Sequence, residues 1–315
     1  MKLYYYQFRD KVSNFGDDLN PWLWEQLLPG VFDEDTTTLF VGIGTLLNEY
    51  VPKVPKTVVF GSGFGYGKGV PKIHDSWKIY CVRGPLTAKA LGIATELAVT
   101  DAALLVRRVY QPTATKVNRF AYIPHVTNAI RGDITWRLIC EQAGIAYIDP
   151  RWSIEHVLSA ISETEVVLAE AMHGAIVADA LRVPWIPICT ESTVLPFKWQ
   201  DWCLSIGVEY QPKYVMPFRG LYPPGPGVRS SLRHWLNWVK QNPSQIVPKI
   251  GEDESKQVAI QLARIAKTSQ PMLSNQNRIE QLTVELEERL QQFRKDTANG
   301  YFRPNTAQLC SNVIY

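Results

Sequence analysis

A histidine and a glycine, His173 and Gly174, follow a short apolar run at residues 166–168 and open a segment with helical character. A second apolar run begins at Trp185, so the pattern predicts a strand, a tight turn, a helix and a strand. The imidazole is then expected at a helix N-terminus, beside the carboxyl end of a strand. Ligands bind at that edge of open α/β sheets, and free backbone N–H groups there attract anions. A lone histidine is usually structural, but this position favours a general acid or an anchor for an anion.

An arginine occupies the same kind of position earlier in the chain. Val82-Arg83-Gly84-Pro85 ends another apolar run, and proline is favoured in the first turn of the helix expected to follow. A guanidinium beside a helix N-terminus can form paired, charge-assisted hydrogen bonds to a carboxylate or a phosphate. We therefore expect Arg83, together with Thr87 of that helix, to bind an anionic substrate. A surface ion pair is the alternative for Arg83.

The run from Asn14 to Asn20 follows the first expected strand. Glycine at position 16 lets the chain turn at the sheet edge, and Asn and Asp are favoured helix caps. Capping by Asp17 or Asp18 explains only part of this run. If the run borders a cleft, Asn14 and a carboxylate such as Asp17 could hold and deprotonate a sugar hydroxyl.

Three further polar side chains follow other expected strands. They are Asp101, His125 and Lys198. Core or surface roles are equally compatible with the histidine and the lysine, which has aromatic residues on both sides in the sequence. Since all three follow strands of the same architecture, they are candidates for the same site as His173.

Two segments resemble cofactor motifs without matching them. Residues 61–69 alternate glycine with other residues, but they fit neither the dinucleotide-binding pattern nor the P-loop pattern. We expect a flexible rim or lid over the cleft there, with a plain turn as the alternative. Asp33-Glu34-Asp35 resembles the Asp-x-Asp of metal-dependent glycosyltransferases, yet it lies in a polar loop without a nearby histidine. Because no His/Cys cluster has zinc spacing either, neither a metal nor a cofactor is expected.

The composition restricts the class of protein. The chain has 315 residues, 46% of them hydrophobic and 20% charged, with a net charge of +3, as in soluble globular proteins. No apolar run reaches the ~20 residues of a membrane span, and no basic block interleaved with aromatic residues indicates nucleic-acid binding. The first residues are expected to form a strand rather than a signal peptide. Five widely spaced cysteines are expected to be reduced core residues, so we expect a cytoplasmic protein.

Apolar runs alternate with helical patterns up to about residue 211, which predicts a parallel α/β architecture. The expected strands are residues 2–7, 39–42, 57–61, 78–82, 96–100, 119–123, 145–148, 164–168, 185–188 and 208–211. The expected helices are residues 18–28, 85–91, 134–143, 154–161, the segment after His173, and residues 197–206, 231–240, 253–267 and 275–293. A polar stretch at residues 107–118 is expected to be a linker.

This organisation predicts an α/β fold with two Rossmann-like domains, residues 1–110 and 119–230, that face each other across a cleft. Glycosyltransferases of the GT-B type have this arrangement. Residues 231–315 are expected to form a helical C-terminal region. Its last helix carries an apolar stripe flanked by charges, and the stripe is expected either to pack back on the protein or to support a homo-oligomer. The stripe consists of Ile279, Leu282, Leu286, Leu290 and Phe293.

Five segments in consistent order resemble the polysaccharide pyruvyltransferase family, and within it the succinoglycan-type exopolysaccharide pyruvyl ketalases of bacteria. The resemblance covers about residues 1–210. The segments are Asn-x-Gly-Asp at 14–17, Gly42-Ile43-Gly44, Val82-Arg83-Gly84-Pro85-Leu86-Thr87, Thr100-Asp101 and His173-Gly174-Ala175. The resemblance implies a GT-B-like fold and transfer of the enolpyruvyl carbons of phosphoenolpyruvate to two hydroxyls of one sugar, which leaves a cyclic ketal.

For this chemistry we expect His173, Asp17 and Asp101 to be catalytic, with the histidine as acid or phosphate anchor and one carboxylate as base. The expected substrate-binding residues are Asn14, Gly16, Gly44, Arg83, Thr87, His125, Gly174 and Lys198. Many family members carry an arginine two residues before the histidine, where this chain has Ala171. The missing charge must then come from Arg83, Lys198, Arg182 or His125.

Phosphoenolpyruvate is a compact anion that requires fixed cations and N–H groups rather than a nucleotide pocket. The expected partners are this donor and a sugar acceptor, which a lipid carrier could hold at the inner face of the membrane. An alternative is a nucleotide-sugar-dependent glycosyltransferase of the same architecture. A catalytically silent carbohydrate-binding or assembly protein is a third hypothesis. Neither the acceptor sugar nor the ketal stereochemistry can be inferred from the sequence.

Overall fold

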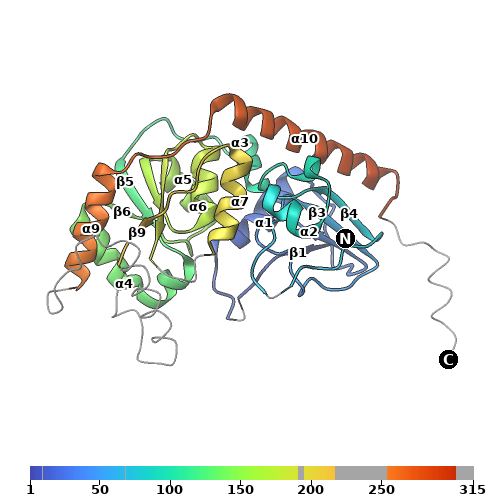
Figure 1. Cartoon of the computed structure of the whole chain (residues 1–315), viewed down its shortest axis with the longest axis horizontal. Helices are drawn as coiled ribbons and strands as arrows, with labels where there is room; N and C mark the ends of the chain where they lie inside the picture. Colours follow the sequence, from blue (N-terminus) through green and yellow to red (C-terminus); the bar gives the residue numbers. More distant parts are fainter. Residues whose placement is uncertain (9, 68, 191–194, 217–253, 303–315) are drawn as a thin grey trace.

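The computed structural model describes residues 1–302, except for residues 9, 68, 191–194 and 217–253. Two parallel sheets lie side by side (Figure 1). The first has the order β1-β2-β3-β4, formed by Lys2–Tyr4, Thr38–Val41, Lys56–Phe60 and Trp77–Cys81. The second has the order β6-β5-β7-β8-β9, formed by Ala146–Tyr147, Asn118–Ile123, Thr164–Ala169, Trp185–Cys189 and Lys213–Tyr214. The prediction of an α/β fold with parallel sheets is therefore confirmed.

A helix lies between β1 and β2 and between each pair of successive strands from β5 to β9, whereas the described segments between β2 and β3 and between β3 and β4 contain no helix. The helices associated with the first sheet are α1 (Phe15–Leu27), α2 (Pro85–Leu91) and α3 (Val106–Val109), with 3₁₀ turns at Thr95–Leu97 and Ala102–Leu105. Those of the second sheet are α4 (Val126–Ala143), α5 (Ile154–Ser162), α6 (Met172–Ala180) and α7 (Pro196–Ile206). Two more helices, α9 (Glu254–Thr268) and α10 (Gln276–Ala298), complete the described chain. None of the described helices combines the length and apolar content that a bilayer crossing requires.

The chain reverses direction across the second sheet next to β5. After β5 it forms β6 on one side, and then returns to form β7 on the other side, with Ile123 in register with Ala169. Such a topological switch point leaves a crevice outside the carboxyl ends of the two strands, and ligands of open α/β sheets bind there. The segments that carry His125 and His173 leave the sheet at this point.

Four expectations about the elements were wrong. Residues 96–100 form no strand: a 3₁₀ turn covers Thr95–Leu97, and only a single bridge joins Ala98 to Val82. Residues 208–211 likewise form no strand, because Tyr210 stacks on Trp199 at 5.4 Å between ring centroids and the ladder starts at Lys213.

The other two corrections concern helix boundaries. Helix α1 begins at Phe15, before the aspartates that were expected to cap it, and α4 begins at Val126 with a kink at Gly132. The expected linker contains most of α3, and its Arg108 bonds Glu280 and Glu287 of α10. The helix expected at residues 231–240 lies outside the described residues.

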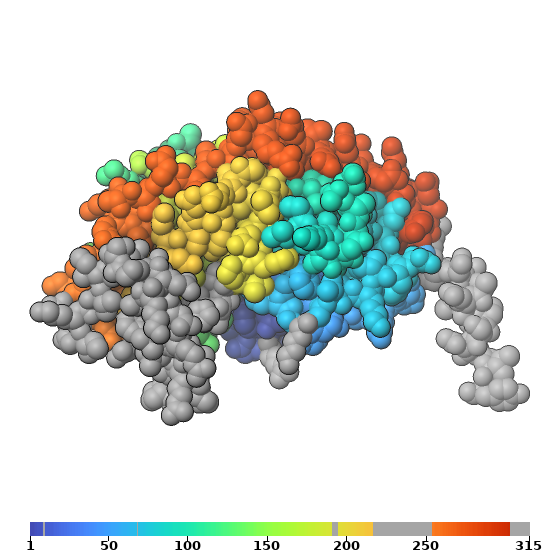
Figure 2. Space-filling view, viewed as in Figure 1, coloured from blue at the N-terminus to red at the C-terminus, as the bar shows by residue number. Residues whose placement is uncertain are grey.

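One continuous hydrophobic core includes side chains from both sheets and from α10. All five residues of the apolar stripe of α10 are buried, and Phe293 makes edge-to-face contacts with Phe40 and Tyr80. The helix extends along both halves of the molecule (Figures 1 and 2). The apolar stripe is therefore buried by packing against other parts of the same chain. Four of the cysteines are described, and three of them, Cys81, Cys140 and Cys203, are buried free thiols.

Candidate active site

A cavity of about 670 Å³ is bordered by segments that follow strands of both sheets. Because every strand within a sheet points the same way, these segments leave each sheet at its carboxyl edge. The cavity brings together seven of the expected site residues from widely separated parts of the chain. They are Asn14, Gly16, Asp17, Gly44, His125, His173 and Lys198.

Three helices start at this cavity. The first residues of α1, α4 and α6 all line it, among them Phe15, Val126 and Met172. Each helix N-terminus carries backbone N–H groups without intrahelical acceptors and a partial positive charge. Their convergence, with the lysine and an arginine described below, makes the cavity suited to an anion.

The imidazole of His173 lies between a glycine and a carboxylate. Its Nε2 is 3.8 Å from Oδ2 of the fully buried Asp101, and neither atom has a hydrogen-bond partner within the described structure. The other carboxylate oxygen of Asp101 accepts a bond from the backbone of Ala103, which fixes its position. A small closing movement would form the His–Asp hydrogen bond, and catalytic bonds are commonly long in unliganded sites. Asp101 is therefore placed to orient His173.

Gly16 makes this position of the imidazole possible. A methyl group at residue 16 would approach Nδ1 of His173 to 2.2 Å, closer than any van der Waals contact. The glycine therefore serves the site by its lack of a side chain, which is a different role from substrate binding.

Asp17 is a partly buried carboxyl with an altered pKa. Burial raises the pKa to about 6, although the hydrogen bond from Asn14 and the nearby His173 and Lys198 act to lower it. The amide of Asn14 donates to Oδ2 of Asp17 at 2.6 Å. A carboxyl with this pKa changes protonation near neutral pH, as a general base or acid must.

His125 caps helix α4 and stays neutral. Its Nδ1 accepts the backbone N–H of Thr127, and burial next to Lys198 and Arg131 lowers its pKa to about 3. With Nδ1 as acceptor, the ring proton is on Nε2. The backbone N–H of His125 in turn bonds the buried Glu170, which also binds Asn128 and so holds the start of α4.

Two cationic side chains line the cavity, and only one of them was expected. Lys198 is 6% exposed and donates to the hydroxyl of Tyr66 at 2.7 Å. Arg131, on the first half of α4, was missed, because this helix was expected to begin only at residue 134. Of the four groups considered as substitutes for an arginine at Ala171, His125 and Lys198 line the cavity. Arg182 does not, because it bonds Asp179 and Ser274.

Arg83 is not at this cavity, in contrast to the expectation. The guanidinium is completely buried: Nε bonds Asp201 of α7 at 3.1 Å, and the other nitrogens bond Thr45 and the carbonyl of Phe64. Thr87 also bonds Asp201, through both its backbone N–H and its hydroxyl. These groups join α2 to α7, which lie against each other in Figure 2. The link from Arg83 to the cavity is indirect: its guanidinium donates a hydrogen bond to the hydroxyl of Thr45, and Thr45 lines the cavity.

The remaining glycines act through the backbone. Gly44 has a φ of +119°, and the preceding residue, Ile43, bonds the side chain of Asn20 through both its N–H and its carbonyl. Asn20 therefore fixes this turn at the cavity. Gly174 lies against Ile123, where a methyl group would come within 2.7 Å, so it allows α6 to pack closely on β5.

The two segments that resembled cofactor motifs have different positions. The glycine-rich segment reaches the cavity through Tyr66, which supports its assignment as a rim. The acidic loop lies elsewhere: Asp33 pairs with the N-terminal amine at 2.6 Å. Among the described residues, no group of three or more His, Cys, Asp or Glu side chains could hold a metal ion.

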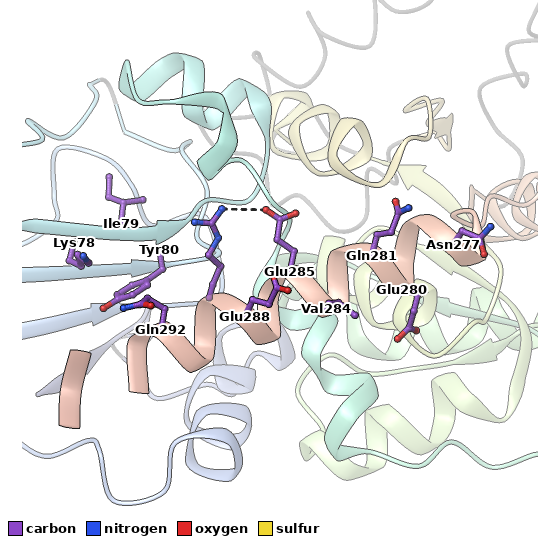
Figure 3. A pocket seen from close by; sticks show the side chains of 11 residues that line it. Lys78, Ile79, Tyr80, Asn277, Glu280, Gln281, Val284, Glu285, Glu288 and Gln292 are labelled. Carbon is purple, nitrogen blue, oxygen red and sulfur yellow. Dashed lines mark hydrogen bonds and ion pairs between the residues drawn. The ribbon is translucent and has the colours of Figure 1, made fainter. Parts of the chain in front are cut away.

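A second hollow of about 910 Å³ lies between β4 and α10 (Figure 3). Its side chains include Lys78 and several glutamates along α10, and Arg289 pairs with Glu285 within it. Glu280 at its edge is bonded to Arg108. This hollow is open surface with paired charges. Only one helix start, that of α10, reaches it through Asn277, and none of the buried polar atoms without a hydrogen-bond partner lines it among the described residues. We therefore place the candidate active site at the smaller cavity.

Comparison with known proteins shows to which family the chain belongs. Residues 11–191 match the family model for polysaccharide pyruvyl transferase. The chain belongs to the polysaccharide pyruvyl transferase family. It is 44% identical over 219 residues to the succinoglycan biosynthesis protein ExoV of Rhizobium meliloti (strain 1021), an alignment that covers 68% of each chain. The resemblance inferred from the sequence motifs is thereby confirmed, and the protein is a transferase.

The matched region contains most of the site. It extends from before Asn14 to beyond His173, and so includes both histidines and the Asp17 carboxyl. Lys198 and the rest of α7 lie beyond it.

Proposed function

We propose that this transferase moves the pyruvyl carbons of phosphoenolpyruvate onto two hydroxyls of a sugar in a bacterial exopolysaccharide unit, which forms a cyclic ketal. The family and the relative that acts in succinoglycan biosynthesis support the reaction class. The observation that carries the choice of donor is the convergence of Lys198, Arg131 and three helix N-termini on one cavity. Phosphoenolpyruvate has a carboxylate and a phosphate close together, and both would be stabilised there.

The proposed chemistry uses two groups of the cavity. His173, oriented by Asp101, supplies the proton that adds to the methylene carbon of the donor. The neighbouring carbon becomes electrophilic, and a sugar hydroxyl attacks it while Asp17 takes the hydroxyl proton. Departure of phosphate leaves the same carbon electrophilic again, and attack by the second hydroxyl closes the ketal ring. Of the two hydroxyl protons released, one balances the proton gained by carbon and the other leaves with phosphate.

Neutral His125 and the cations have binding roles in this proposal. The proton on Nε2 of His125 can be donated to an oxygen of the donor, because Nδ1 is engaged at the helix cap. Lys198 and Arg131 would neutralise the donor and stabilise the departing phosphate. No metal ion or cofactor is part of the proposal.

The proposal also includes the domain organisation. Residues 1–110 and 119–230 would be the two Rossmann-like domains of a GT-B-like enzyme, with residues 231–315 as a helical extension. The acceptor would be an oligosaccharide unit, carried on a lipid at the inner face of the membrane if the unit is assembled there.

Donor identity is tested by ligand-induced stabilisation and by turnover. Phosphoenolpyruvate at 100 times its dissociation constant should stabilise the protein by about 2.7 kcal/mol, and phosphate should be released when a suitable glycan is present. Lys198→Met should greatly reduce the thermal shift, whereas Lys267→Met, at an exposed position on α9, should leave it unchanged. Stabilisation by UDP or GDP, with none by phosphoenolpyruvate, would instead support a nucleotide-sugar glycosyltransferase.

The pKa of Asp17 predicts how the rate depends on pH. A base with a pKa of about 6 is active when deprotonated, so its contribution is present above pH 6 and is lost as the pH falls below 6. The phosphate of the donor also titrates near pH 6, as phosphomonoesters do. We therefore expect the ratio of wild-type to Asp17→Asn rates to rise through about pH 6 and then level off, since the substrate contributes equally to both. A ratio that does not change between pH 5 and pH 8 would remove Asp17 from the proton transfer.

A further inference from the structure

Three tyrosines form an exposed aromatic rim at the mouth of the cavity. Tyr6, Tyr50 and Tyr66 line the cavity and yet are 54%, 66% and 45% exposed. They come from three separate segments: the one after β1, the loop after β2 and the glycine-rich segment after β3. Large aromatic side chains that stay in contact with water at a cavity commonly contact a ligand.

The walls of the cavity differ in chemistry. Arg131, His125 and Lys198 follow strands of the second sheet, whereas the tyrosines of the rim follow strands of the first sheet. Tyr4 and Phe8, which are partly buried, add to the aromatic side. The cavity therefore has an ionic wall suited to a small anion and an aromatic wall suited to an uncharged ligand with apolar faces.

Packing within the protein does not explain the exposure of these rings. Five of the described tryptophans are in the core, and three of these, Trp185, Trp199 and Trp202, lie against one another. Two of the rim tyrosines are nevertheless held in place. The ring of Tyr6 contacts Phe8 edge to face at 5.2 Å, and the hydroxyl of Tyr66 accepts the bond from Lys198. Rings that are oriented but exposed lose little conformational entropy when they bind.

We infer that the aromatic rim is an acceptor subsite, which binds sugar units next to the one that receives the ketal. The inference rests on the proposed function and specifies its acceptor as an oligosaccharide of at least two units. Tyrosine faces pack on the C–H faces of sugar rings, and the hydroxyls remain available for hydrogen bonds. A cavity of about 670 Å³ is in the range that holds drug-sized ligands, roughly 300–1,000 Å³, and therefore has room for more than the small donor.

Equilibrium binding without donor tests the inference separately from turnover. Calorimetry would compare oligosaccharides cut from depyruvylated succinoglycan with the methyl glycosides of glucose and galactose. Wild-type protein should bind the oligosaccharides more tightly. Tyr6→Ala and Tyr50→Ala should each raise the oligosaccharide dissociation constant by roughly tenfold, which corresponds to about 1.4 kcal/mol. The thermal shift with phosphoenolpyruvate should stay as in wild type.

Two further comparisons distinguish a binding role from a structural one. Tyr66→Phe keeps the ring and removes the hydroxyl that Lys198 bonds, so it should weaken oligosaccharide binding less than Tyr66→Ala, which removes the ring as well. Tyr214→Ala changes a tyrosine that is 41% exposed and does not line the cavity, and it should have no effect.

The inference is overturned if the Tyr6 and Tyr50 variants bind oligosaccharides as tightly as wild type, or if wild type binds single-sugar glycosides equally well. It is also overturned if no glycan binds to the wild-type protein. In that case a thermal shift with phosphoenolpyruvate would still support the donor site. Absence of the shift, together with absence of phosphate release, would instead contradict the proposed function.

Discussion

His173→Ala is expected to lower the turnover number by roughly 10²–10⁴, the usual contribution of a general acid or base. The physical reason is the position of the imidazole beside Asp101. Nε2 of His173 and Oδ2 of Asp101 face each other at 3.8 Å, and both atoms are buried without a hydrogen-bond partner in the described structure. Removing the imidazole takes away the proposed proton source. It also leaves the anion-binding side chains in place, so the thermal shift with phosphoenolpyruvate should largely persist. Stopped assays of phosphate release at saturating donor would measure the loss.

Two variants control for indirect effects of this change. His156→Ala removes an exposed histidine that stacks on Trp152 outside the cavity, and it should leave turnover unchanged. Asp101→Asn should reduce turnover less than the loss of the histidine, and the double variant should be little worse than His173→Ala alone, because residues that act as a unit are not additive. If His173→Ala retains turnover within a factor of three of wild type, the histidine is not the acid.

Arg83→Ala is expected to destabilise the protein by about 3–5 kcal/mol, the cost of breaking a buried ion pair by removing one partner. The substitution leaves the carboxylate of Asp201 buried with only the bonds from Thr87, and it leaves an unfilled space beneath Gly63. Such a loss is a large part of the 5–15 kcal/mol that separates folded from unfolded proteins. Chemical denaturation would measure it.

The same experiment decides between the two roles considered for Arg83. Removing both partners in Arg83→Ala/Asp201→Ala should destabilise by less than the sum of the single changes. Arg289→Ala, which breaks a partly exposed pair on α10, should cost at most about 1 kcal/mol. An Arg83→Ala protein with wild-type stability and greatly weakened donor binding would favour the sequence-based expectation that Arg83 clamps the anion.

Much of the fold followed from local patterns in the sequence. The boundaries of α2 and β3 were predicted to within one residue, because proline starts the helix and a left-handed glycine ends it, while the strand is a buried apolar run. One of the failures occurred where a turn competed with a strand. At residues 96–100 the side chain of Asp101 caps the next 3₁₀ turn, and the chain bends away from the sheet.

The site was predicted in part because topology constrains it. In a parallel sheet all strands end at the same edge, so His173 and His125, each recognised as following a strand, were bound to lie near one another. Asp17 follows a strand of the other sheet, and only the packing of the two sheets brings it to the same cavity. The same reasoning misplaced Arg83, which also follows a strand. Its position at the sheet edge was predicted, but the direction of its side chain depends on Asp201, 118 positions later in the chain.

The sequence by itself determined the parallel α/β class, the polar residues at the strand ends and the family, because these depend on periodicity and on order along the chain. Only the tertiary structure decided which charges are satisfied. Asp201 neutralises Arg83, while Lys198 and Arg131 line the cavity with the helix N-termini. It also decided that, within the part of the chain that the structure describes, tyrosines rather than tryptophans border the cavity. The partner of a charge and the exposure of a ring depend on contacts between residues that packing brings together, and these contacts leave no local pattern in the sequence.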